Sequence, residues 1–169
     1  MDTGKIEWIY QGLPGDVWNS ACHVDEDANC PDDAGPDEDM GSSPMLITLP
    51  AGKRLLAAGQ KTGILHVLDP DNGGKLLWQK KLAEGGILGG IEWGPATDGK
   101  YFYVAKADVT WRDQRFVSAD TELNPNTDGG TVAVDASSGD IVWEAPPLSC
   151  EGRKSCSPGQ TGAVTAIPG

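Results

Sequence analysis

The sequence predicts an all-β protein, and three observations support this prediction. A five-residue phrase, consisting of glycine, a polar residue, an apolar residue, any residue and tryptophan, occurs at 4–8, 74–78 and 139–143. The second and third copies each follow a short run rich in apolar residues and a polar turn. Helical periodicity of apolar residues is scarce throughout the chain. The recurring unit is therefore a β-hairpin whose second strand carries a tryptophan.

The spacing of these hairpins predicts how they assemble. The tryptophans Trp8, Trp78 and Trp143 lie 70 and then 65 residues apart. Four short strands in a repeat of this length are typical of a β-propeller blade, in which a large aromatic side chain fills the space between neighbouring blades. Further strands are expected at residues 44–48, 54–58, 101–106 and 163–167.

We expect about two complete blades, at residues 40–80 and 98–146. Residues 1–12 are expected to end a preceding blade, with a last strand at 3–10, and residues 160–169 to begin a following one. A propeller needs roughly 4 to 8 blades to protect its sheet edges, so two blades do not close a ring. The sequence therefore predicts a partial propeller, an internal fragment of a longer one.

Charge and hydropathy exclude two classes of partner. The net charge of -12 and the pI near 4.4 argue against nucleic acid, whose phosphates require a basic face. No apolar run approaches the roughly 18 residues that a membrane span requires. Eight of the 25 acidic residues lie between Asp25 and Asp39, which predicts an extended acidic loop.

The four cysteines form two close pairs, Cys22 with Cys30 and Cys150 with Cys156. Both pairs lie in stretches rich in turn-forming residues, where a short loop can bring two sulfur atoms together. Two disulfides and an oxidising compartment are the favoured interpretation, and free thiols are the alternative. Zinc is disfavoured because the spacings, with seven and five intervening residues, do not match its usual sites.

Three longer segments resemble a known family. They read Gly-Pro-Asp-Glu-Asp-Met-Gly-Ser-Ser-Pro at 35–44, Ala-Gly-Gln-Lys-Thr-Gly at 58–63 and Gly-Ile-Leu-Gly-Gly-Ile-Glu-Trp-Gly at 86–94. Together with the tryptophan repeat, they resemble the propellers of pyrroloquinoline quinone (PQQ)-dependent alcohol dehydrogenases, in particular polyvinyl alcohol dehydrogenase. The resemblance extends from about Gly4 to Gly169. The haem-binding Cys-x-x-Cys-His motif does not occur.

This resemblance implies an enzyme that oxidises a secondary alcohol by hydride transfer to the quinone. Amino-acid side chains can supply a base for the hydroxyl proton but no hydride acceptor, so a cofactor is required. The family implies PQQ and Ca²⁺ as cofactors, cytochrome c as electron acceptor and the periplasm as compartment. The sequence does not identify the residues that would bind calcium.

Two aspartates are candidates for the catalytic base. In the pattern of the family that the chain resembles, the base is an aspartate in the loop before an Asp-x-Asp…Pro strand, and Asp37 or Asp39 occupies that position, with Asp37 favoured. The structural alternative is that both carboxylates simply solvate the acidic loop.

Four residues are candidates for cofactor binding. Lys61, with Gln60 beside it, matches the lysine that contacts the quinone oxygens, where a cation stabilises developing negative charge. Trp93 is expected to stack on the quinone ring, and Gly90 to let the backbone approach it. The structural alternatives are an ordinary surface lysine at a turn and one more tryptophan that packs between blades.

Two other functions are alternatives to the dehydrogenase. A non-catalytic propeller that binds protein partners could use the tryptophan repeat for packing alone. Such a scaffold would have no need for the segments at 35–44, 58–63 and 86–94 together. An acidic module stabilised by calcium rests only on residues 25–39 and ranks last.

Overall fold

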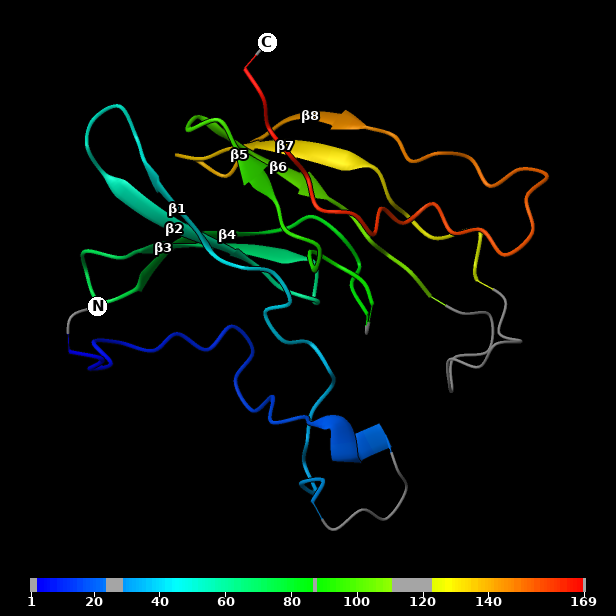
Figure 1. The fold of residues 1–169 in the computed structure, drawn as a ribbon, viewed down its shortest axis with the longest axis horizontal. Coiled ribbons are helices and arrows are strands. Elements are labelled where there is room, and N and C mark those ends of the chain that lie inside the picture. Colours follow the sequence, from blue (N-terminus) through cyan, green and yellow to red (C-terminus); the bar gives the residue numbers. More distant parts are fainter. Residues whose placement is uncertain (1–2, 24–28, 87, 111–122, 169) are drawn as a thin grey trace.

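The computed structural model describes residues 3–23, 29–86, 88–110 and 123–168 (Figure 1). Within these ranges it contains one short 3-10 helix, η1 (Ser20–His23), and two four-stranded antiparallel sheets. The all-β prediction is confirmed. No helix in the described part of the chain is long and apolar enough to cross a membrane. Part of the predicted acidic loop, at 25–27, lies outside the described residues.

The first sheet holds its strands in chain order, each antiparallel to the next. Its central strand β2 alternates between exposed and buried residues, as expected for a strand with one face on the core. The turn after β3 is closed by a hydrogen bond from the Gly74 N–H to the Asp69 carbonyl, 3.0 Å long. Its strands are β1 (Met45–Thr48), β2 (Arg54–Gly59), β3 (Ile64–Asp69) and β4 (Lys75–Lys81).

The second sheet repeats this order. Its strands are β5 (Ala96–Thr97), β6 (Tyr101–Ala105), β7 (Thr131–Asp135) and β8 (Ile141–Ala145). The sequence pattern did not predict β5, because two residues are too few to show an alternation of apolar and polar side chains.

The two sheets are also alike in register. Trp78 on β4 pairs with Val67 on β3, and Trp143 on β8 pairs with Ala133 on β7. In both sheets the register shifts immediately beyond this pair. A bulge adds one residue to a strand and increases its twist. The tryptophan repeat read from the sequence therefore corresponds to a repeated three-dimensional unit.

One apolar core joins the two sheets, and both sheets lie against each other in Figure 1. Alternate residues on β2, β3, β6 and β7 point into this core. Ile91, from the segment that connects the sheets, is 1% exposed and belongs to it. The other buried members are Ile47, Leu55, Ala57, Leu65, Val67, Phe102, Val104, Val132, Val134 and Ala136.

Trp78 packs between the sheets, as the repeat predicts. Its ring centroid lies 6.3 Å from that of Phe102 on β6. Its indole N–H donates to the Ala136 carbonyl at 3.3 Å. A Cβ on Gly139 would come within 2.9 Å of the Trp78 ring. Trp143 holds the same register position in the second sheet but is 44% exposed, and its ring contacts Tyr103.

Two segments that were expected to be strands are not strands in the structure. Residues 3–10 and 163–167 lie without regular strand pairing. A strand exists only where a neighbouring strand accepts and donates its backbone hydrogen bonds, and the described residues provide no such neighbour. A single bond from the Val164 N–H to the Gly94 carbonyl, 3.0 Å long, ties the second segment to the chain.

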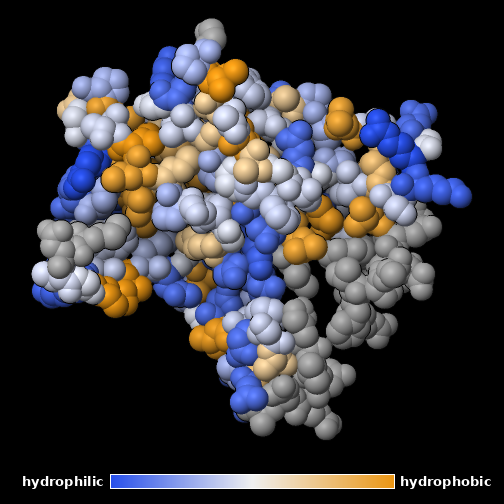
Figure 2. Space-filling model, in the orientation of Figure 1, coloured by the Kyte–Doolittle hydropathy of each residue, from blue (hydrophilic) through white to orange (hydrophobic). Residues whose placement is uncertain are grey.

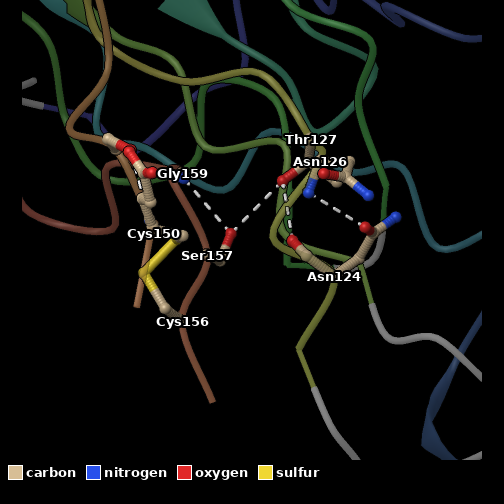
Figure 3. The surroundings of a disulfide bond; sticks show 9 residues. Asn124, Asn126, Thr127, Cys150, Cys156, Ser157 and Gly159 are labelled. Atoms are coloured by element: carbon tan, nitrogen blue, oxygen red, sulfur yellow. Dashed lines mark hydrogen bonds between the residues drawn. A yellow bond between two sulfur atoms is a disulfide. The ribbon is translucent and has the colours of Figure 1, made fainter. Parts of the chain in front are cut away.

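Both predicted disulfides, Cys22–Cys30 and Cys150–Cys156, are present. The second disulfide cross-links the loop after β8. This loop lies next to the loop that precedes β7 (Figure 3). Beside it the Ser157 hydroxyl lies 3.3 Å from the Thr127 hydroxyl and accepts from the Gly159 N–H. The described cysteines are therefore structural, and none has a free thiol.

Apolar side chains interrupt the polar surface in several places (Figure 2). One group lies on β8, where Ile141, Val142 and Trp143 are 42 to 47% exposed. A hollow of about 920 Å³ between Trp143 and residues 164–168 adjoins this strand. Strand β8 of the second sheet thus exposes apolar side chains. In the first sheet, Trp78 at the matching position on β4 packs against Phe102 of the second sheet.

We predict that Gly139→Ala destabilises the fold more than Gly52→Ala. Both glycines have positive φ, but a Cβ at Gly52 meets nothing within 4 Å. Strained backbone costs about 1 to 2 kcal/mol at either position. The contact with Trp78 adds roughly 1 kcal/mol or more at Gly139 alone. Urea denaturation of both variants measures the difference, and equal loss in the two would argue against tryptophan packing as the cause.

Candidate functional site

A buried ion pair links the segment before β1 to the turn between β2 and β3. The Lys61 ammonium lies 2.8 Å from the Asp37 carboxylate and 3.2 Å from that of Asp39. The side chains of Lys61 and Asp37 are 11% and 8% exposed, whereas that of Asp39 is 67% exposed. The structure therefore brings together three of the residues singled out from the sequence.

Backbone hydrogen bonds position these side chains. The Lys61 N–H donates to the Asp39 carbonyl at 3.0 Å, which ties the two segments directly. The turn itself is closed by bonds from the Gln60 N–H to the Ile64 carbonyl and from the Gly63 N–H to the Gln60 carbonyl. The ammonium is thus presented by a hydrogen-bonded turn at the end of a hairpin.

The charge balance around Lys61 favours its protonated form. Burial lowers the pKa of Lys61, but the hydrogen bonds to Asp37 and Asp39 and their negative charges raise it, and the net shift is upward. An ammonium group has three N–H donors. Among the described residues, two carboxylates lie within ion-pair distance of it, and an ammonium has the capacity for a third acceptor.

A second network fixes Gln60, the neighbour of Lys61. Its amide oxygen lies 2.9 Å from both the Thr62 hydroxyl and the His66 Nε2 atom. Because an amide oxygen can only accept, His66 donates from Nε2, and its Nδ1 atom accepts from the Tyr10 hydroxyl at 2.9 Å. Burial lowers the pKa of His66, which keeps the ring neutral. In this structure Gln60 is engaged with protein groups.

The segment that connects the sheets packs against the Lys61 turn. Gly90 has a φ of 68°, and a Cβ there would come within 2.3 Å of the Lys61 carbonyl oxygen. The Ile91 N–H donates to the Gln60 carbonyl, and the Gly90 carbonyl accepts from Ala107. Gly90 therefore permits a close approach between two backbone segments, and a cofactor contact at this residue remains a prediction.

Three buried polar atoms near this junction have no hydrogen-bond partner among the described residues. They are the Ser42 hydroxyl oxygen, the Glu92 Oε2 atom and the Trp93 indole nitrogen. Buried polar atoms are usually hydrogen-bonded, to protein, to water or to a ligand, so these three atoms can each receive a partner from outside the described residues. Ser42 follows the segment that contains Asp39, and Trp93 follows the segment that contains Ile91. Both segments make backbone hydrogen bonds to the Lys61 turn.

Glu92 is the residue that the sequence analysis missed. Burial raises its pKa, Lys61 lowers it, and the negative charges of Asp39 and Asp37 raise it, with an upward net shift. Its position inside a glycine-rich segment beside Trp93 was visible in the sequence. A carboxyl group in such a segment was the available signal, but only the fold places it near Lys61.

This arrangement combines groups that acid–base and anion-binding chemistry require. Asp37 can accept a proton when ionised, and Lys61 can bind a ligand oxygen that gains negative charge. The described residues hold no group of three or more metal-ligating side chains.

The chain is similar along its whole length to two polyvinylalcohol dehydrogenases. It is 36% identical over 172 residues to the protein of a Pseudomonas species, covering 100% of this chain and 25% of that protein. It is 32% identical over 174 residues to the protein of Sphingopyxis strain 113P3, covering 99% of this chain and 25% of that protein. No family model and no solved structure matches the chain.

These similarities confirm the resemblance to polyvinyl alcohol dehydrogenase that three motifs and the tryptophan repeat predicted. The chain spans about a quarter of the length of the curated relatives that it matches.

We predict a strong energetic coupling between Lys61 and Asp37. A double-mutant cycle with Lys61→Met and Asp37→Asn should give about 2 kcal/mol, because removal of either partner leaves the other buried and unpaired. Since the pKa of Lys61 is raised above its ordinary value, the lysine stays charged at neutral pH, and the coupling should be lost as the pH rises into the strongly alkaline range.

The exposed pair Arg54–Asp71 supplies the matched control. Its side chains are 47% and 51% exposed, so solvent screens their attraction and its coupling should be smaller. Free energies from urea denaturation measure both cycles. A coupling at Lys61 no larger than at Arg54 would contradict the structural account of the site.

Proposed function

We propose that this chain, which is homologous throughout to polyvinylalcohol dehydrogenases, supplies part of the active site of a PQQ-dependent alcohol dehydrogenase. The observation that carries the proposal is the buried Lys61–Asp37 pair, whose ammonium has the capacity for a further oxygen acceptor. It unites a base and a cation in one place, as alcohol oxidation requires. The substrate class is a secondary alcohol of the polyvinyl alcohol type, as the names of the relatives suggest.

The residues present offer hydrogen-bond donors to an oxygen-rich ligand such as PQQ. The Lys61 ammonium has the capacity for a third acceptor, and the Trp93 indole N–H and the Ser42 hydroxyl are buried without partners among the described residues. PQQ, when bound, accepts the hydride that no side chain can accept. We propose that Lys61 contacts the oxygen atoms of PQQ. Trp93 faces the PQQ ring, and Gly90 and Gln60 support this arrangement.

The protein's own part in the reaction is proton transfer and charge stabilisation. Asp37 accepts the hydroxyl proton of the alcohol, and Asp39 is the alternative base. Asp37 is better suited because it is buried, whereas Asp39 is largely exposed to water. Lys61 stabilises negative charge on the ligand oxygen that faces it, an effect that burial strengthens.

The wider role follows from the family resemblance. We propose cytochrome c as the electron acceptor and the periplasm as the compartment, and two disulfides support an oxidising environment. Calcium is also implied by the family. The residues of this chain that would bind it are not identified.

We predict that Lys61→Ala and Asp37→Asn affect different measurements. Titration of the purified protein with PQQ, followed by quinone absorbance, should show at least a tenfold loss of affinity in Lys61→Ala, because a ligand contact is removed. Asp37→Asn should retain binding but lose about 10² to 10⁴ in kcat with secondary alcohols, because the base is absent.

The exposed lysine Lys53 provides the control, since Lys53→Ala removes a positive charge away from this site. It should bind and turn over like the wild type. A folded protein that ignores PQQ, and whose Lys61 can be replaced without effect, would leave the non-catalytic propeller that binds protein partners as the better account.

A further inference from the structure

The side-chain amide of Gln60 is hydrogen-bonded at its oxygen but not at its nitrogen. Gln60 is 3% exposed and lies beside Lys61 on the turn between β2 and β3. Its Oε1 atom lies 2.9 Å from both the Thr62 hydroxyl and the His66 Nε2 atom. Its Nε2 atom, which carries two N–H donors, has no acceptor among the described residues. A buried glutamine therefore keeps two donors for a partner that the described residues do not supply.

The Thr62 hydroxyl determines which end of this amide is free. Its oxygen accepts from the Ile64 N–H at 3.3 Å, and its own hydrogen finds an acceptor among the described residues only in the Gln60 oxygen. In the reversed amide, Thr62 would face an N–H donor, and its hydrogen would be left without an acceptor. The oxygen of the amide therefore faces Thr62 and His66, and the nitrogen is the free end.

His66 holds the same amide from the neighbouring strand β3. The ring is 1% exposed, and burial lowers its pKa, so it stays neutral. A neutral imidazole carries one N–H, which here belongs to Nε2 and is donated to the Gln60 oxygen. Nδ1 then accepts from the Tyr10 hydroxyl at 2.9 Å. Tyr10 thereby favours one tautomer of His66, and that tautomer favours one orientation of the amide.

The free amide nitrogen lies where two other segments meet. A Cβ added to Gly12 would lie 3.0 Å from the Gln60 Nε2 atom and 2.6 Å from the Met40 Cε atom. Met40 follows Asp39, whose carbonyl accepts from the Lys61 N–H and whose carboxylate lies 3.2 Å from the Lys61 ammonium. One turn therefore carries both the amide nitrogen and the ammonium, and the same segment before β1 borders both.

We propose that Tyr10 and His66 are positioning residues, which keep the Gln60 amide nitrogen free to donate to an oxygen atom of bound PQQ. The proposal rests on the proposed function, in which Lys61 contacts oxygen atoms of the same ligand. Gln60 touches the ligand, whereas His66 and Tyr10 act only through Gln60. A leucine would fill the buried position of His66 but would leave the amide free to turn over.

NMR of the ¹⁵N-labelled protein observes the tautomer and the amide directly. Without ligand, His66 should show a protonated Nε2 and an unprotonated Nδ1, and His66→Gln identifies its signals. Tyr10→Phe should raise the population of the other tautomer, and an unchanged ratio would remove Tyr10 from the proposal. On titration with PQQ, the side-chain NH₂ signals of Gln60, assigned with Gln60→Glu, should shift, whereas those of the exposed Asn126 should not. An Nδ1–H tautomer at His66 would overturn the proposal.

Affinities for PQQ separate positioning from stability. Gln60→Glu keeps an oxygen for Thr62 and His66 but loses both N–H donors, so it should lower the affinity by about tenfold or more. Asn126→Asp makes the same change of charge on an exposed amide in the loop before β7, and it should bind like the wild type.

The histidine itself is tested by a pair of variants. His66→Leu should lower the affinity by roughly three- to tenfold, because the amide loses its fixed orientation. His66→Gln, which can still donate to the Gln60 oxygen, should restore most of this loss. Urea denaturation shows which variants fold, and if His66→Leu does not, Gln60→Glu and the NMR titration decide the proposal.

The outcomes distinguish this inference from the function on which it rests. A protein in which Lys61→Ala weakens PQQ binding, while Gln60→Glu binds like the wild type or the Gln60 NH₂ signals stay unmoved, overturns the inference and leaves the proposed function in place. A folded protein that binds no PQQ overturns both.

Discussion

The structure depends on the burial of two small sheets against each other. A sheet with one apolar face must bury that face against another element, so the inward face of each sheet requires a partner. Here β2 and β3 provide one half of the core, and β6 and β7 provide the other. Ile91 contributes to the same core from the connecting segment. The packing that stabilises the sheets thereby also holds that segment beside the Lys61 turn.

The connecting segment is held by polar contacts at both of its sides. The Lys81 ammonium donates to the carbonyls of Thr62 and Glu84, at 2.6 and 2.7 Å. The buried Asp108 carboxylate accepts from the N–H groups of Glu84 and Gly85, both at 3.0 Å. One contact comes from the first sheet and the other from the residues that follow β6. Glu92 is consequently placed by both sheets, and neither alone determines its position.

Packing alone does not explain the charges of the candidate site. A propeller whose only task is to present loops requires the hairpins, the tryptophans and the glycines that receive them. It gains nothing from a lysine buried with one aspartate and flanked by two further carboxyl groups, since such pairs are weak contributors to stability. The hollow of about 920 Å³ near Trp143 does not include Asp37, Lys61 or Glu92 among its lining residues. Charge and burial, rather than cavity size, therefore distinguish the candidate site.

The repeated hairpins, the positions of their tryptophans, the cysteine pairing and the resemblance to polyvinyl alcohol dehydrogenase could all be predicted from the sequence. These features are local or repeated, because alternation, turn glycines and short cysteine spacing act over a few residues. It also identified Asp37 and Lys61 as candidates, through motifs that surround each of them.

Other features were decided by the tertiary structure alone. Residues 3–10 and 163–167 have strand-like sequences but no strand beside them, and pairing is not a local property. Gly90 was expected to approach a flat ring, and in the structure it packs on the Lys61 backbone. The proximity of Glu92 to Lys61 arises because two separate sheets bury one core, and the pKa of a carboxyl group depends on such distances and on burial.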